Sequence, residues 1–262
     1  MWTPIAEEAE RATQVLHPHG REMPRPAHRR ILTVANQKGG VGKTTSTVNL
    51  AAALTSYGMR VLAVDLDPQG NASTALGVEH TSGTPSVYEA LLGEITLLDA
   101  VVPSTQSPEL LCVPATIDLA GAEIELVSMV ARESRLKQAL NDAVLDQLDV
   151  DYVLIDCPPS LGLLTVNALV AAAEVLIPIQ CEYFALEGLS QIIELARQTK
   201  ARDNHRLEIG GIVLTMFDPG LELANEVAGE VREYFADAVF DSIIPRDVAI
   251  SEAPSHGRSV MD

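Results

Sequence analysis

Residues 36–45 read Asn-Gln-Lys-Gly-Gly-Val-Gly-Lys-Thr-Thr and directly follow the apolar, β-branched run of residues 31–35. A strand, a glycine-rich turn and then a helical pattern form the context of a phosphate-binding loop. Glycines let the backbone turn tightly and bring its N–H groups close to phosphate oxygens. We therefore predict a nucleotide site at which Lys43 reaches the β and γ phosphates and the Thr44 hydroxyl binds Mg²⁺.

The loop departs from the usual G-x-x-x-x-G-K-[ST] pattern, because Gln37 takes the place of the first glycine and a second lysine, Lys38, precedes Lys43. A solvated loop charge is the plainer interpretation of Lys38. Residues 38–45, however, resemble the deviant Walker A motif of the ParA/MinD family of dimerising ATPases. The resemblance implies that Lys38 crosses to the nucleotide of a second subunit. It also implies ATP binding by the whole loop: Lys38, Gly39, Gly40, Val41, Gly42, Lys43, Thr44 and Thr45.

Two further apolar runs end in carboxylates. Residues 65–71 resemble the switch segment of chromosomal ParA proteins, which implies that the second aspartate, Asp67, orients the attacking water. A polar turn is enough to explain Pro68, Gly70 and Asn71, and Asp65 is assigned to a structural role or to the outer shell of the metal. Asp156 follows the apolar run of residues 152–155 in a Walker B arrangement. A carboxylate there holds Mg²⁺, directly or through water, opposite Thr44.

The resemblance extends over nearly all of residues 30–260, through the segments 117–123, 180–188, 244–246 and 251–255. It implies that Pro245 and Arg246 lie near the adenine. Two departures stand out. Family members usually continue past the last of these segments into a final helix, and Gly220 and Leu221 stand where the family commonly has a DNA-contacting arginine.

Helical and strand-like patterns alternate along the chain, which predicts a doubly wound, mostly parallel α/β sheet in one domain over residues 30–262. A flexible arm is expected over residues 1–29, where prolines interrupt any regular pattern. The expected strands are 60–65, 110–113, 152–156, 175–179, 209–216 and 239–244. The expected helices are 44–57, 86–92, 118–130, 132–148, 163–173, 186–200 and 221–236.

Composition narrows the function classes. Of the 262 residues, 47% are hydrophobic, which supports a sizeable core, and no run is long enough to span a membrane. The three cysteines are far apart and favour buried thiols in a reducing cytoplasm over a zinc site. The net charge of −18 argues against general affinity for nucleic acid.

One basic cluster interrupts this acidic background, with Asp203 as the only opposing charge expected within it. It is a candidate surface for DNA phosphates. Alternatively, its members merely complement the negative C-terminal end of helix 186–200. The cluster comprises Arg197, Lys200, Arg202 and Arg206.

The resemblance implies an ATPase with ATP and Mg²⁺ as cofactors, in which Lys38, Lys43 and Asp67 carry the catalysis. It further implies an ATP-dependent homodimer that binds nonspecific double-stranded DNA, is released by a ParB-like partner and associates with the nucleoid. Whether the cargo is a chromosome or a plasmid stays open. A MinD-like positioning ATPase would need a basic amphipathic C-terminal helix, which residues 251–262 do not offer. An iron–sulfur reductase and a non-hydrolysing nucleotide-binding scaffold are two further functions that the same loop could serve.

Overall fold

A computed structural model describes residues 23–253 and 257–260, so most of the predicted N-terminal arm lies outside the described residues. The part of it that is described, residues 23–29, is anchored to the domain. The Met23 N–H donates to the carbonyl of Tyr57 at 3.3 Å, and Arg29 donates to the carbonyl of Val150 at 3.0 Å and to Asp146 at 2.9 Å. These contacts hold the described end of the predicted arm against the segment that precedes residues 152–156.

Residues 23–253 and 257–260 form one eight-stranded sheet in the order β3-β4-β2-β5-β1-β6-β7-β8. Every pairing is parallel except that of β3 with β4. The doubly wound, mostly parallel sheet predicted from the sequence is thereby confirmed. The strands are β1 (Arg30–Val34), β2 (Val61–Asp65), β3 (Val102–Pro103), β4 (Leu110–Val113), β5 (Tyr152–Asp156), β6 (Glu174–Gln180), β7 (Glu208–Phe217) and β8 (Val239–Pro245).

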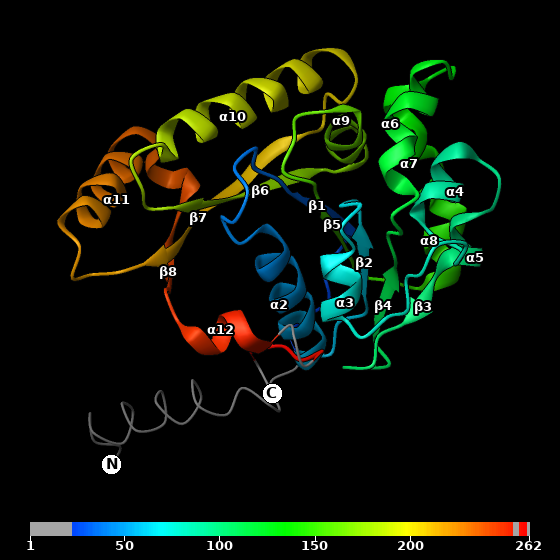
Figure 1. Ribbon diagram of the computed structural model, residues 1–262, viewed down its shortest axis with the longest axis horizontal. Coiled ribbons are helices and arrows are strands. Elements are labelled where there is room, and N and C mark those ends of the chain that lie inside the picture. The colour runs from blue at the N-terminus through cyan, green and yellow to red at the C-terminus, as the bar shows by residue number, and fades with distance from the viewer. Residues whose placement is uncertain (1–22, 254–256, 261–262) are drawn as a thin grey trace.

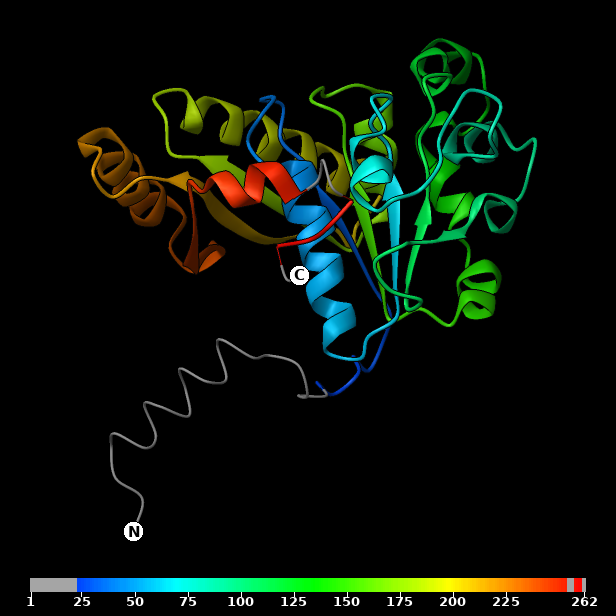
Figure 2. The same cartoon turned by 60° about the horizontal axis from the view of Figure 1, so that its bottom comes forward.

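Helices cover both faces of the sheet (Figures 1 and 2). Buried strands have apolar side chains on both faces, and alternate residues of β2 divide between two separate cores. Leu62 and Val64 belong to the larger core, with helices α9 (Leu163–Ala171), α10 (Ala185–Arg202) and α11 (Glu222–Phe235). Val61 and Ala63 belong to a smaller core, with helices α2 (Lys43–Ser56) and α3 (Asn71–Ala75). This division follows from the two-residue period of a strand.

The helices mostly agree with the predicted spans, with one clear exception. The prediction of one helix over 132–148 is wrong. One helix ends at its C-cap, Leu140, and Asn141 caps the start of the next, where its side chain accepts the N–H of Val144 at 3.1 Å. The α-helices are α2 (Lys43–Ser56), α3 (Asn71–Ala75), α4 (Val87–Leu92), α5 (Leu97–Ala100), α6 (Leu119–Val127), α7 (Arg135–Ala139), α8 (Asp142–Leu148), α9 (Leu163–Ala171), α10 (Ala185–Arg202), α11 (Glu222–Phe235) and α12 (Val248–Glu252). None of the helices within the described residues could cross a bilayer.

The strand register brings the predicted chemistry to one edge of the sheet. Val34 at the end of β1 is level with Asp156 at the end of β5, and Asp156 is level with Asp65 at the end of β2. The phosphate loop follows β1 directly. The loop and both carboxylate-bearing turns therefore lie side by side at the C-terminal edge, where open α/β sheets bind ligands.

Candidate nucleotide-binding site

The backbone of the phosphate loop requires glycine at two positions. Gly40 and Gly42 have φ angles of 75° and 86°, in the left-handed region that side chains other than glycine rarely adopt. Gly42 is also the N-cap of α2, and no side chain in the described part of the chain caps that end of the helix. The first N–H groups of a 14-residue helix thus face the loop, which is the usual arrangement for binding an anion.

Lys43 lies inside this loop. Its side chain is buried, and its Nζ donates to the carbonyl of Lys38 at 3.1 Å. Burial lowers the pKa of Lys43, and the nearby charge of Asp156 partly opposes that effect. A buried ammonium held by one carbonyl is ready to exchange that acceptor for phosphate oxygens.

Thr44 and Asp156 meet as the motif predicts. The Thr44 hydroxyl donates to Oδ2 of Asp156 at 2.7 Å, and the Thr47 hydroxyl, one helical turn later, donates to Oδ1 at 3.2 Å. Mg²⁺ prefers hydroxyl and carboxylate oxygens and completes its shell with phosphates and water, so these residues fit that ion. Nowhere in the described chain do three or more His, Cys, Asp or Glu residues form a metal-binding group by themselves. The contribution of Thr47 was missed from the sequence, although its spacing from Thr44 is that of one helical face.

The two buried aspartates differ in what they bind. The Asp65 carboxylate accepts the N–H and the hydroxyl of Ser73, at 2.8 and 2.7 Å, and the N–H of Asp67 at 3.1 Å. These bonds fix the turn that carries Asp67. Burial raises the pKa of Asp65 to about 6, and it raises the pKa of Asp156 to about 8 with the negative charge of Asp65 as the next contribution. The metal-free site is therefore an unfavourable place for two negative charges.

Asp67 follows the end of β2 and belongs to the turn. It is 8% exposed, and its Oδ1 accepts the N–H of Gln69 at 3.0 Å. Its negative charge is one of the smaller effects that oppose the lowering of the Lys43 pKa. One carboxylate oxygen of Asp67 is thus held by the turn while the side chain lies in the electrostatic range of the loop lysine.

The side chain of Lys38 points away from that of Lys43. Its Nζ forms an ion pair with Oε2 of Glu182 at 2.6 Å, beyond the end of β6. Sequence reasoning gave Glu182 no role, because the contact depends on β6 lying next to β1 and joins residues 144 apart in the chain.

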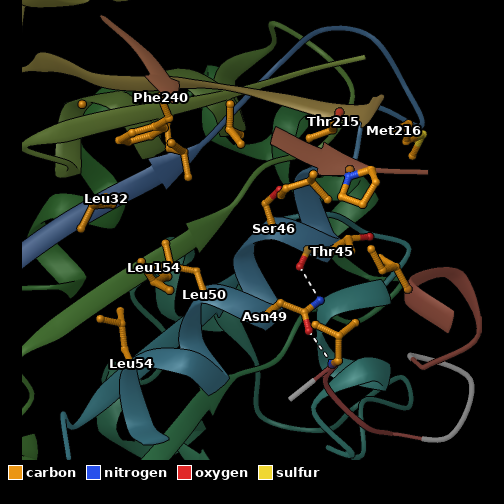
Figure 3. A pocket seen from close by; sticks show the side chains of 18 of the residues that line it. Leu32, Thr45, Ser46, Asn49, Leu50, Leu54, Leu154, Thr215, Met216 and Phe240 are labelled. Carbon is orange, nitrogen blue, oxygen red and sulfur yellow. Dashed lines mark hydrogen bonds between the residues drawn. The ribbon is translucent and has the colours of Figure 1, made fainter. Parts of the chain in front are cut away.

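A cavity of about 720 Å³ opens beside the loop (Figure 3). Gly42, Thr45 and Ser46 line it together with Pro245 and Arg246, the residues predicted near the adenine. Its remaining wall is mainly apolar and runs along α2 and the sheet to Met23. Apolar lining residues include Leu32, Leu50, Leu54, Leu154, Leu176, Val213, Phe240 and Ile244.

Two residues at the end of β7 complete this wall and were missed from the sequence. The Thr215 hydroxyl donates to the carbonyl of Val41 at 2.9 Å and so ties β7 to the phosphate loop. Met216 has a φ of 50°, a conformation that costs about 1–3 kcal/mol and that recurs at ligand sites. No residue-type signal marks this strain, which lies where the register between β7 and β8 shifts, between Leu214 and Phe217.

The predicted basic cluster lies at the opposite edge of the sheet, at the end of α10. Two of its four cations are neutralised: Arg197 pairs with Glu194 at 2.8 Å, and Lys200 pairs with Glu208 at 2.6 Å. The expectation that only Asp203 opposes the cluster is therefore wrong, because helical spacing supplies one acid and the start of β7 another. Within the described residues, neither Arg202 nor Arg206 forms an ion pair.

Comparison with known proteins assigns the chain to a family. A family model described as an AAA domain matches residues 29–209. The sporulation initiation inhibitor protein Soj of Bacillus subtilis is 51% identical over 88% of this chain and 90% of its own length. The chromosome partitioning protein ParA of Caulobacter vibrioides is 50% identical over 88% of this chain and 86% of its own.

A solved structure adds the ligands of a relative. It is described as cobyrinic acid a,c-diamide synthase from Mycobacterium smegmatis with bound ATP analogue and magnesium. It is 40% identical, has a TM-score of 0.77, and the match covers 87% of this chain and 93% of that one. Soj and ParA share about half of their aligned residues with this chain, which also has the deviant phosphate loop and the two carboxylate-bearing turns. The chain therefore belongs to the ParA/Soj family of chromosome- and plasmid-partitioning ATPases.

Proposed function

We propose that this chain is a DNA-partitioning ATPase that alternates between a monomer and an ATP-bound dimer. One observation carries the proposal: the uncapped start of α2, the buried Lys43 and the Thr44–Asp156 pair meet at a single point. That arrangement suits a magnesium nucleotide whose phosphates lie on the loop and whose base extends toward Pro245 and Arg246.

The residues divide the work of hydrolysis. Bound Mg²⁺ would offset the charge that develops on the phosphates. Lys43 supplies a fixed positive charge in a site that already disfavours water, and Asp67 orients the attacking water. Lys38 points out of its own loop and is therefore placed to act on the nucleotide of a second subunit. Asp65 serves this chemistry indirectly, by fixing the turn that presents Asp67.

In the second half of the cycle, the ATP dimer binds double-stranded DNA without sequence preference and follows the nucleoid. Pairing two subunits doubles the number of unpaired arginines, which favours phosphate contacts despite the acidic chain. A ParB-like partner stimulates hydrolysis and releases the dimer. Family membership supports this part of the proposal.

The proposal is tested by ATP-dependent dimerisation measured by light scattering, with phosphate release measured in parallel. We expect Asp67→Ala to dimerise with ATP and stall, because only the water-positioning carboxylate is lost. Lys38→Ala should bind ATP but neither close the dimer nor hydrolyse. Gln69→Ala is the matched control, since Asp67 is held by the backbone N–H of residue 69 and not by its side chain. Hydrolysis by Asp67→Ala at the parent rate would remove Asp67 from catalysis.

Different outcomes of the same measurements identify the rivals. Tight ATP binding without phosphate release would make the chain a nucleotide-dependent scaffold, and ATP-dependent binding to vesicles in place of DNA would make it a membrane-positioning ATPase. An iron–sulfur reductase is disfavoured because Cys112, Cys157 and Cys181 are all buried. Burial also raises the pKa of Cys157 to about 12, so that this sulfur stays a thiol and is unsuited to bind iron.

A further inference from the structure

The ion pair between Lys38 and Glu182 is built into the end of β6. The Lys38 N–H donates to Oδ1 of Asn36 at 3.0 Å, while Nδ2 of Asn36 donates to the carbonyl of Pro178 at 2.8 Å. On the other side, the Gln180 amide donates to the second oxygen of Glu182. Both partners of the pair are thus positioned by the same strand, which makes the contact a preformed one.

The start of α10 packs directly against Asn36. Gly188, in the first turn of α10, lies against the loop so closely that a Cβ there would come within 3.2 Å of Oδ1 of Asn36. The residues before the phosphate loop and the start of α10 are therefore in direct contact, so that a movement of one would displace the other.

The segment that carries Glu182 is nevertheless poorly covered. Tyr183 and Phe184 follow it with 77% and 62% of their surfaces exposed, and their rings contact each other edge to face, with centroids 5.1 Å apart. The side chains of Lys38 and Glu182 are themselves 31% and 48% exposed. Ion pairs between such exposed groups are weak, so this one can open without disturbing the core.

We infer that Glu182 is a latch that holds Lys38 within its own subunit until a second, nucleotide-loaded subunit displaces it. The inference rests on the proposed function, because the competitor for Lys38 is a nucleotide phosphate of the partner subunit. The polyphosphate carries more negative charge than one carboxylate and outcompetes it at close range. Glu182 is thus a positioning residue: it competes with the partner's nucleotide for Lys38 and so lowers the affinity of dimerisation.

Zero-length carbodiimide coupling tests the latch directly, since the reagent joins an amine and a carboxylate that are already in contact. In the nucleotide-free full chain we expect an amide between Lys38 and Glu182, identified by mass spectrometry, and its loss when a non-hydrolysable ATP analogue is added. The internal control is the Lys200–Glu208 pair, which has the same 2.6 Å distance and is also solvent-accessible but lies at the opposite edge of the sheet. Its coupling should not respond to nucleotide. Absence of the Lys38–Glu182 product, or a yield that ignores nucleotide, would overturn the latch whether or not the chain dimerises.

Substitution of Glu182 measures the effect of the latch on assembly. Glu182→Ala should tighten dimerisation with the analogue by about two- to fivefold, the range expected for loss of an exposed ion pair. In a Lys38→Ala background, which we expect not to close the dimer, Glu182→Ala should not restore dimerisation, because the latch acts only through Lys38. Glu187→Ala, in the first turn of α10, is the surface control. Weaker dimerisation of Glu182→Ala would place Glu182 in the interface and refute the latch. Failure of the parent chain to dimerise at all would refute the proposed function, while the coupling experiment would still decide the contact.

Discussion

At the scale of single residues, the two loop lysines differ in how far they are buried and in which groups they contact. Lys43 is 7% exposed and faces the phosphates, so its removal leaves them without their nearest cation. We expect Lys43→Ala to weaken ATP binding by about a hundredfold or more, since hydrogen bonds to charged groups contribute roughly 1.5–3 kcal/mol and burial adds to their cost. Isothermal titration calorimetry checks this, with exposed Lys137→Ala as the control. Normal ATP affinity in Lys43→Ala would mean that the phosphates bind elsewhere.

The raised pKa values of Asp65 and Asp156 predict how stability depends on pH. The folded, nucleotide-free chain keeps protons on these carboxyls that the unfolded chain releases near pH 3.8. Their contribution to the free energy of unfolding is fully present below pH 3.8 and is lost as the pH rises through about 6 for Asp65 and about 8 for Asp156.

Urea unfolding of the nucleotide-free chain between pH 5 and about pH 8 tests this expectation. Relative to the parent, Asp156→Asn should gain stability with rising pH, by up to about 1.4 kcal/mol per pH unit for one proton. Adding Mg²⁺ and ATP should reduce the loss of stability that the parent shows with rising pH, because a cation beside Asp156 favours its ionised form. Parallel pH profiles for parent and variant would contradict the assignment.

At the scale of elements, the break between α7 and α8 depends on one cap. The Asn141 side chain accepts the N–H of Val144 at the start of α8. Asn141→Ala should lower the free energy of unfolding by about 1 kcal/mol, as loss of such caps usually does. Chemical denaturation measures this, and Gln138→Ala, an exposed substitution in the preceding helix, should be nearly neutral. Equal stability of the two variants would show that the cap contributes nothing.

The same elements show what the sequence could and could not predict. The segment from β1 through the phosphate loop to α2, and the ends of β2 and β5, were predictable because the positions of glycine, lysine and aspartate mark them locally. The break at Asn141 was missed because apolar residues on both sides continue a helical period, and period alone does not detect a cap. The Lys38–Glu182 pair and the strained Met216 depend on which strands become neighbours, a property that no local pattern contains.

At the scale of the whole molecule, a net charge of −18 sets the conditions for DNA binding. With Arg197 and Lys200 already paired, binding depends on Arg202 and Arg206. The double variant Arg202→Glu and Arg206→Glu should weaken DNA binding of the ATP dimer without changing ATPase activity in the absence of DNA. Its salt slope should fall by about one for each phosphate that the variant no longer neutralises. Fluorescence anisotropy over a series of salt concentrations measures both quantities.

Arg197→Ala provides the contrast for that experiment, because this residue is already neutralised by Glu194 and should have a smaller effect. Unchanged affinity and slope in the double variant would move the DNA surface away from the end of α10. The arginines at 21, 25, 29 and 30 would then be the next set to substitute.

The cavity beside α2 has a consequence for inhibitor chemistry. Its volume of about 720 Å³ is typical of sites that hold drug-sized compounds, and its apolar wall extends well past Thr45 and Ser46. A compound with an anionic group for the phosphate loop and a hydrocarbon arm directed toward Leu50 and Leu54 would gain about 25 cal/mol for each Å² of apolar surface that it buries. Lengthening that arm in a compound series should therefore lower the concentration needed to displace ATP in a competition titration. A flat series would show that the apolar wall is closed to ligands in solution.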